Sequence, residues 1–134
     1  MKRFIDTNLF LRYFTNDDET KAKQVLELLL RMERGEERLI TSPLVIFETI
    51  FTLEKFYKVP KTEIRELMLP ILALKGLEVP FKEMYQQALE LYIKHSISFT
   101  DAFNAVFMLS GGIKEIYSYD KDFEKIKEIK RLVP

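Results

Sequence analysis

The sequence predicts an α/β protein, with a short, mainly parallel central sheet and helices on both of its faces. Short apolar runs that suit strands alternate along the chain with longer segments whose apolar residues recur at helical spacing. Alternating strands and helices favour parallel strands, because each helix carries the chain back to the same edge of the sheet. The length of 134 residues and the 47% hydrophobic content suit one packed core. We therefore expect residues 1–134 to form a single three-layer α/β/α domain.

The first predicted strand, Lys2–Asp6, leads directly into a helix over Thr7–Phe14, which carries apolar residues at helical spacing. The turn Asn16–Glu19 supplies N-cap residues for a second helix that runs to about Arg34. Gly35 is expected to end that helix. A short strand over Arg38–Thr41 follows.

Ser42 and Pro43 are an N-cap and a first-turn proline, which predict a helix that continues through Tyr57. Residues 59–62 open the next helix, and Gly76 ends it. Pro70 is expected to kink or split this helix, because proline lacks the backbone N–H and its ring clashes with the preceding turn. The strand Leu77–Val79 comes next.

The last third of the chain repeats the alternation. Pro80 starts a turn into a helix, and Gly111-Gly112 closes the following one. The expected elements are helices over Lys82–His95 and Phe99–Leu109, a strand over Glu115–Tyr119, a short helix over Phe123–Ile129 and an edge strand over Arg131–Val133.

Composition excludes several classes of chemistry. The chain has no cysteine and a single histidine, His95, so it offers no disulfide, thiolate zinc site or multi-histidine site. Twenty-one basic and 21 acidic residues balance, which argues against a strongly basic nucleic-acid binder. No apolar run reaches the length of a membrane span, and Asp6 interrupts any signal-peptide core. We expect a soluble cytoplasmic protein with no membrane association.

Four acidic residues lie in unusual sequence surroundings. Asp6 ends the first strand, and Asp120 follows the strand that ends at Tyr119. Glu48 and Asp101 are each the single charge within a long apolar stretch. A carboxylate in apolar surroundings must be protonated, paired or bound to a metal. If the four acids converge at one end of the sheet, they need a cation between them.

Oxygen ligands without histidine or cysteine select a hard ion, Mg²⁺ or Mn²⁺. The chemistry that fits such a site is phosphodiester hydrolysis, in which a metal-activated water attacks phosphorus in line and the ion stabilises the leaving oxygen.

Simpler roles remain open for each acid. Asp6 is also suited to cap the first helix, Asp101 to favour the N-terminus of its helix, and Asp120 to occupy an ordinary turn. Glu48 lies mid-helix, where capping is impossible, so its alternatives are an exposed position or a buried ion pair. Arg12 and the lysines of Lys121–Arg131 are suited either to contact phosphates or to stay solvated.

The ordered set of motifs resembles the PIN domain, with the small VapC-type toxins as the nearest pattern. The resemblance is carried by Asp6-Thr7-Asn8 after a strand, by Glu48 after Ser42-Pro43, by Thr100-Asp101-Ala102 and by the stretch Ser118–Phe123. These motifs cover nearly the whole chain in the right order.

The resemblance implies a metal-dependent endoribonuclease with a PIN-like α/β/α fold. Asp6, Glu48 and Asp101 match the family's three typical acids, and Asp120 matches a less regular fourth. Asp122 is a candidate to share that fourth role, or to cap the helix beginning at Phe123. The neighbouring small polar residues are read as donors to the carboxylates or to water, with helix capping as the alternative: Thr7, Asn8, Thr100 and Ser118.

The same resemblance implies an RNA substrate, a cognate VapB-like antitoxin and a homodimer. The apolar segments Phe10–Phe14 and Leu44–Phe56 are candidate antitoxin surfaces, although they serve equally well as core. The alternatives are a housekeeping PIN ribonuclease in RNA maturation or decay, and a non-catalytic PIN-like binding module. A receiver or nucleotide-binding domain is disfavoured because the chain has no glycine-rich phosphate loop.

Overall fold

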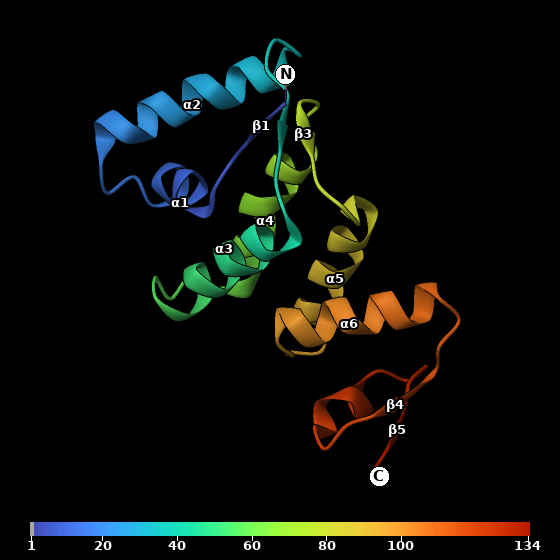
Figure 1. The fold of residues 1–134 in the computed structure, drawn as a ribbon. Helices are drawn as coiled ribbons and strands as arrows, with labels where there is room; N and C mark the ends of the chain where they lie inside the picture. Colours follow the sequence, from blue (N-terminus) through green and yellow to red (C-terminus); the bar gives the residue numbers. More distant parts are fainter. Residues whose placement is uncertain (1) are drawn as a thin grey trace. The chain divides into compact units, whose positions relative to one another are not determined.

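The computed structural model describes residues 2–134 and divides into two compact units, Met1–Lys82 and Glu83–Pro134 (Figure 1). The first contains β1 (Arg3–Phe4), α1 (Thr7–Thr15), α2 (Glu19–Glu33), β2 (Leu39–Ile40), α3 (Pro43–Lys55), α4 (Lys61–Leu72) and β3 (Leu77–Glu78). The boundary falls at the start of α5 (Lys82–Lys94). The second unit continues with α6 (Phe99–Ser110), β4 (Glu115–Tyr117), the 3-10 helix η1 (Lys121–Lys125) and β5 (Lys130–Leu132).

The first unit is built on a parallel three-stranded sheet in the order β1-β2-β3. The ladder extends past the strands, because Ile5 N–H donates to Ile40 O at 3.0 Å and Thr41 N–H to Glu78 O at 2.9 Å. The Thr41 hydroxyl also donates to Ile5 O at 2.8 Å. These bonds fix the backbone at the carboxyl end of β1, which is where Asp6 follows and where open parallel sheets place their sites.

Helices α1 and α2 pack beside this sheet around a common core. Its buried members come from the sheet and from four helices: Ile5, Phe10, Val25, Leu29, Met32, Leu39, Val45, Ile71 and Leu77. Val25, Leu29 and Met32 recur at helical spacing on α2, as expected from the 3.6-residue repeat, whereas Leu26 and Leu30 of the same helix are exposed.

The cap signals at Ser42-Pro43 and Gly35 are confirmed, whereas α4 ends at Leu72, ahead of the end predicted at Gly76. The Ser42 hydroxyl accepts from Val45 N–H at 3.3 Å, with Pro43 in the first turn of α3. Gly35 follows α2 with φ of +76°, a left-handed conformation that glycine adopts at no steric cost. The predicted split at Pro70 is wrong, because α4 runs through it and ends two residues later. Proline in the last turn costs the helix little beyond one hydrogen bond.

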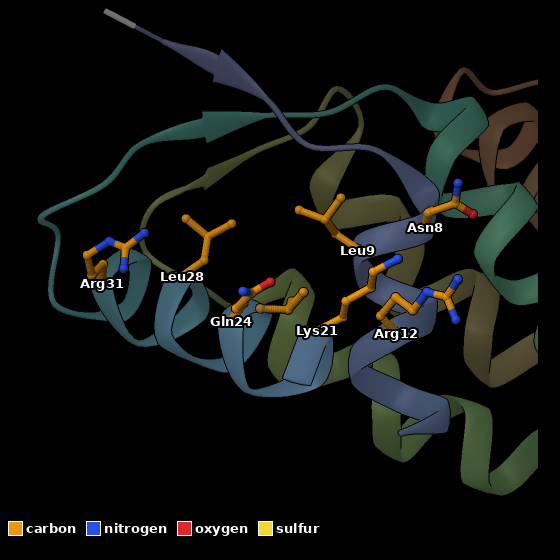
Figure 2. Close-up of a pocket in the computed structure, with 8 residues that line it drawn as sticks. Asn8, Leu9, Arg12, Lys21, Gln24, Leu28 and Arg31 are labelled. Atoms are coloured by element: carbon orange, nitrogen blue, oxygen red, sulfur yellow. The ribbon is translucent and has the colours of Figure 1, made fainter. Parts of the chain in front are cut away.

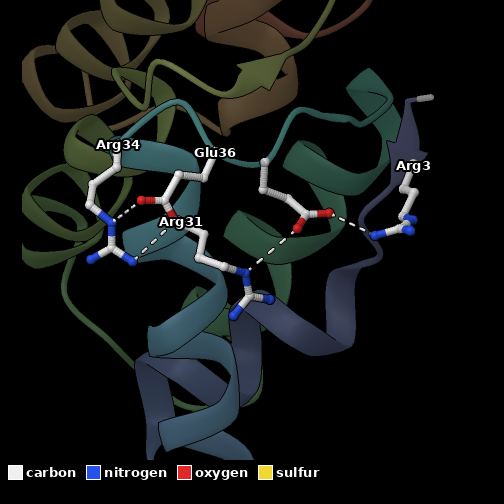
Figure 3. A network of polar contacts seen from close by, with 5 residues as sticks. Arg3, Arg31, Arg34 and Glu36 are labelled. Carbon is white, nitrogen blue, oxygen red and sulfur yellow. Dashed lines mark hydrogen bonds and ion pairs between the residues drawn. The ribbon is translucent and has the colours of Figure 1, made fainter.

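A network of ion pairs fixes the loop between α2 and β2 (Figure 3). Glu37 accepts from Arg3 Nη1 at 3.0 Å and lies 3.6 Å from Arg31 Nε, while Arg34 Nε contacts Glu36 at 2.8 Å. The network therefore ties the first strand to the end of α2.

In the second unit β4 and β5 pair in parallel, with Ile116 opposite Arg131. The predicted edge strand near the C-terminus is therefore present, although it joins a separate two-stranded sheet. The predicted helix Phe123–Ile129 is wrong: the structure has η1, and Ile126 is already extended. The spacing of the apolar residues had predicted an α-helix. Phe123, Ile126 and Ile129 are all buried, and their interval of three residues also suits a 3-10 turn followed by extended chain.

The aromatic residues of α5 and α6 form the core of the second unit. The Tyr85 and Phe103 rings lie 5.4 Å apart, and those of Tyr92 and Phe99 5.8 Å apart. All four are buried, whereas Phe107 is exposed. Among residues 2–134 no helix combines the length and the apolar character that a membrane crossing requires.

The α/β class with parallel strands is confirmed, although each unit carries its own short ladder. The single domain over residues 1–134 stays a prediction.

Candidate metal centre

Three aspartates meet in the second unit. One carboxylate oxygen from each of Asp101, Asp120 and Asp122 lies within 4.8 Å of the others. Asp101 is in the first turn of α6, Asp120 follows β4 as the N-cap of η1, and Asp122 lies within η1. The end of a strand and the start of a helix thus bring together two acids that are 19 positions apart in the sequence.

Small hydroxyl side chains position this cluster. The Ser98 hydroxyl caps α6 by accepting from Asp101 N–H at 3.1 Å, so the Asp101 carboxylate is not needed as a cap. In the loop after β4, Ser118 Oγ accepts from Asp120 N–H at 3.0 Å. Asp120 Oδ1 in turn accepts from Asp122 N–H at 2.9 Å. Asp120 therefore caps a turn and also belongs to the acidic cluster, while its role as a metal ligand stays a prediction.

The electrostatics of the cluster are unfavourable without a cation. Partial burial raises the pKa of Asp101, and the neighbouring Asp120 and Asp122 raise it further, against the Ser98 hydroxyl, which lowers it. Lys125 neutralises part of this negative charge, since its Nζ lies 3.1 Å from the Asp122 carboxylate. The donor set is oxygen only and carries excess negative charge, which fits Mg²⁺ or Mn²⁺.

The other two predicted acids lie in the first unit, and both are exposed. Asp6 occupies the N-cap position of α1, but its side chain accepts no capping hydrogen bond. Glu48 lies on the solvent face of α3, while Val45, Ile46 and Ile50 on the same helix are buried. Of the two alternatives left open for Glu48, the exposed position is the one observed. Participation of Asp6 and Glu48 in the site stays a prediction.

The predicted supporting residues differ in their surroundings. Thr7 is buried, at 3% exposed, and its hydroxyl has no hydrogen-bond partner within residues 2–134. An unpartnered hydroxyl beside Asp6 fits a donor to a metal-bound ligand, because a buried polar group left alone is costly. Asn8 and Thr100 are exposed, and Ser118 acts as the cap described above.

Several basic residues that were candidates for phosphate contact have acidic partners. Arg12 Nη1 lies 3.2 Å from Asp17, and Arg131 pairs with Glu124 at 3.0 Å while donating to Ser118 O at 2.9 Å. Sequence reasoning missed Ser98. The Ser98-x-x-Asp101 spacing ahead of an apolar helix was the available signal, because it is the pattern of an N-cap followed by an acid at the third position.

The parallel strands and the aspartate cluster define an α/β protein with a group of carboxylates that could hold a metal ion. The chain matches the PIN domain family over residues 3–129 and belongs to that family. It is 27% identical over 124 residues to a VapC ribonuclease of Aquifex aeolicus (strain VF5), an alignment that covers 92% of this chain and 91% of the relative.

A search of solved structures finds the Mycobacterium tuberculosis toxin VapC20, described as cleaving the sarcin-ricin loop. The identity is 21% and the TM-score 0.40, with 92% of this chain and 93% of that chain covered.

Proposed function

We propose that this protein is a Mg²⁺- or Mn²⁺-dependent endoribonuclease and the toxin of a VapBC-type toxin–antitoxin pair. The observation that carries the proposal is the cluster of Asp101, Asp120 and Asp122 in a chain of the PIN family. The relative named VapC ribonuclease supports the ribonuclease class.

In this proposal Asp101 and Asp120 are ligands of the ion, Asp122 adds a further oxygen, and Asp6 and Glu48 are candidate ligands from the first unit. When bound, the ion supplies positive charge to the phosphorus centre, the attacking water and the leaving oxygen. The cap bonds from Ser98 and Ser118 hold the two aspartates in place before substrate arrives. Lys125 offsets the charge of Asp122, which leaves Asp101 and Asp120 as the stronger ligands. The Thr7 hydroxyl is placed to donate beside Asp6. The expected products carry 5′-phosphate and 3′-hydroxyl ends.

The direct test is cleavage of labelled RNA by the purified chain. We expect EDTA to abolish cleavage and Mn²⁺ to restore it. Asp101→Asn and Asp6→Asn should keep the circular dichroism spectrum of the wild type and lose activity, because amides are weaker metal ligands than carboxylates. Glu128→Gln, which removes an exposed charge of the second unit, is the matched control. Cleavage that survives excess EDTA would contradict the metal-dependent mechanism.

The toxin role and the partners need separate experiments. We propose that the protein acts on RNA in the cytoplasm, so its expression should arrest the growth of the cells. Co-expression of the product of a small neighbouring gene should relieve the arrest. Arrest by Asp101→Asn would show that RNA cleavage is not its cause. Cleavage without arrest would favour a housekeeping role in RNA maturation or decay. Light scattering tests the proposed homodimer.

A further inference from the structure

The first unit contains a hollow of about 550 Å³ between α1 and α2 (Figure 2). We name it the cationic pocket, and it is lined by Asn8, Leu9, Arg12, Lys21, Gln24, Val25, Leu28 and Arg31. Three of these side chains are cations, two are amides and none is an acid. We infer that the cationic pocket holds a backbone phosphate of the RNA strand, beside the bond that the proposed active site cleaves.

The local charge is the first argument. Basic and acidic residues balance over the whole chain, so three cations around one hollow without an acid in its lining are a local separation of charge. Arg12 and Arg31 each contact one acid, Asp17 at 3.2 Å and Glu37 at 3.6 Å. A guanidinium has five N–H donors, so both arginines keep donors for a further anion.

Lys21 differs from the two arginines of the pocket, which each contact an acid. Its backbone N–H donates to the Asp18 cap at 3.0 Å, but its ammonium has no ion pair among the described residues 2–134. An exposed ammonium beside the Arg12 guanidinium is repelled by it and gains from an anion placed between the two groups. A phosphate supplies that anion, since Lys and Arg side chains are its usual partners.

Helical geometry and the packing of α1 on α2 bring Asn8, Arg12 and Lys21 to one end of the pocket. Asn8 and Arg12 are four residues apart on α1 and share one face. Lys21, Gln24 and Arg31 recur on one face of α2. In Figure 2 the Asn8, Arg12 and Lys21 side chains gather at one end of the pocket, and Arg31 lies at the other. Leu9, Val25 and Leu28 supply an apolar floor, which limits water around a bound phosphate and strengthens its hydrogen bonds.

The position of the pocket links it to the substrate. Helix α1 starts at Thr7, directly after Asp6, so Asn8 lies two positions beyond a proposed metal ligand. Arg12 follows four residues after Asn8, about 6 Å further along the helix axis at about 1.5 Å per residue. A strand whose reacting phosphate lies at Asp6 therefore carries a neighbouring phosphate towards the pocket. This step rests on the proposed function, because it takes Asp6 as part of the cleavage site.

The experiment measures binding of fluorescein-labelled 12-nucleotide RNA in EDTA, where the proposed reaction is off, and cleavage of the same RNA in Mn²⁺. Lys21→Gln and the double variant Lys21→Gln/Arg31→Gln are compared with Lys23→Gln, an exposed lysine of the same helix outside the pocket. We expect roughly tenfold weaker binding for Lys21→Gln, and more for the double variant. The slope of log affinity against log salt should fall by about 0.7 per lost phosphate contact. Lys21→Arg should restore most of the affinity.

The outcomes separate the two proposals. If the wild type cleaves RNA and the Lys21 variants bind and cleave as Lys23→Gln does, the cationic pocket is overturned and the proposed function stands. If RNA binding depends on Lys21 but Mn²⁺ produces no cleavage, the pocket is supported and the nuclease proposal falls. If RNA binding is unchanged while a 12-residue poly-glutamate peptide loses affinity in Lys21→Gln, the pocket serves an acidic protein segment and the inference is wrong. Wild-type protein that binds no RNA overturns both.

Discussion

The aspartate cluster predicts an opposite effect of one substitution in the absence and the presence of metal. Asp101→Asn keeps the shape of the side chain, and the cap bond from Ser98 survives because it involves the Asp101 backbone N–H. The substitution removes one negative charge from a group whose carboxylate oxygens lie within 4.8 Å of each other. Without metal, the variant should be more stable than the wild type; with metal, it should be less stable.

The magnitude follows from Coulomb's law. At 4.8 Å, two unit charges repel by about 0.9 kcal/mol in water. Asp120 is exposed, so the dielectric constant of water is the suitable choice for this cluster. Asp101 has two acidic neighbours, so its neutralisation should add about 1–2 kcal/mol to the free energy of unfolding. For a chain of this length, Tm in EDTA should rise by roughly 3–6 °C. Low ionic strength keeps the effect at its largest.

Metal should reverse the order. A ligand present at about 100 times its Kd stabilises the folded state by about 2.7 kcal/mol, and the wild type should gain that amount in Mn²⁺. Asp101→Asn loses a ligand and should gain much less. Differential scanning calorimetry in EDTA and in Mn²⁺ measures both differences, with Glu128→Gln as the charge-matched control. A lower Tm of Asp101→Asn in EDTA, or an equal Mn²⁺ gain in both proteins, would refute the reasoning.

Two further predictions concern stability. Gly76→Ala should cost about 1–3 kcal/mol in urea unfolding, because its Cβ would collide with the carbonyl oxygen of Glu37; Gly111→Ala, with no contact closer than 3.6 Å, is the control and should be nearly neutral. Burial raises the pKa of Tyr85 to about 12. The folded state then keeps a proton that the unfolded chain loses near pH 10, so stability falls as pH rises from 10 to 12, by about 1.4 kcal/mol at pH 11. Tyr85→Phe should lose less stability than the wild type between pH 8 and 11, and an equal loss in both proteins would contradict that assignment.

The family and the fold class could be predicted from the sequence because they depend on short motifs and on helix ends, which a few neighbouring residues determine. Ser42-Pro43 and Gly35 mark helix ends by the conformations that their own backbones allow. Membership of the PIN family is confirmed, and the name of the Aquifex aeolicus relative agrees with the predicted ribonuclease class. The short helix near Phe123 was wrong because buried residues at every third position fit a helix almost as well as a 3-10 turn with extended chain.

The candidate site could be predicted from the sequence only in part. Asp101 and Asp120 were singled out by their sequence surroundings, and the structure brings them together with Asp122. Glu48 is exposed, which its sequence surroundings did not reveal because an acid in an apolar helix can lie on the face that meets solvent, and its role as a ligand stays a prediction. The cationic pocket could not be predicted from charge counts, since Arg12 and Lys21 belong to different helices and meet only through the packing of α1 on α2.

The way the aspartates are held leaves their carboxylates available for the proposed metal ion. Glu37 reduces the cost of its charge by pairing with two arginines. Asp101 and Asp120 are instead fixed through backbone N–H groups that bond to serine hydroxyls. Their position is therefore set without a cation from the protein, and their charges remain to attract one from solution. A site built in this way gives up stability in the metal-free state, which is why stabilisation by Asp101→Asn in EDTA tests the assignment independently of any RNA substrate.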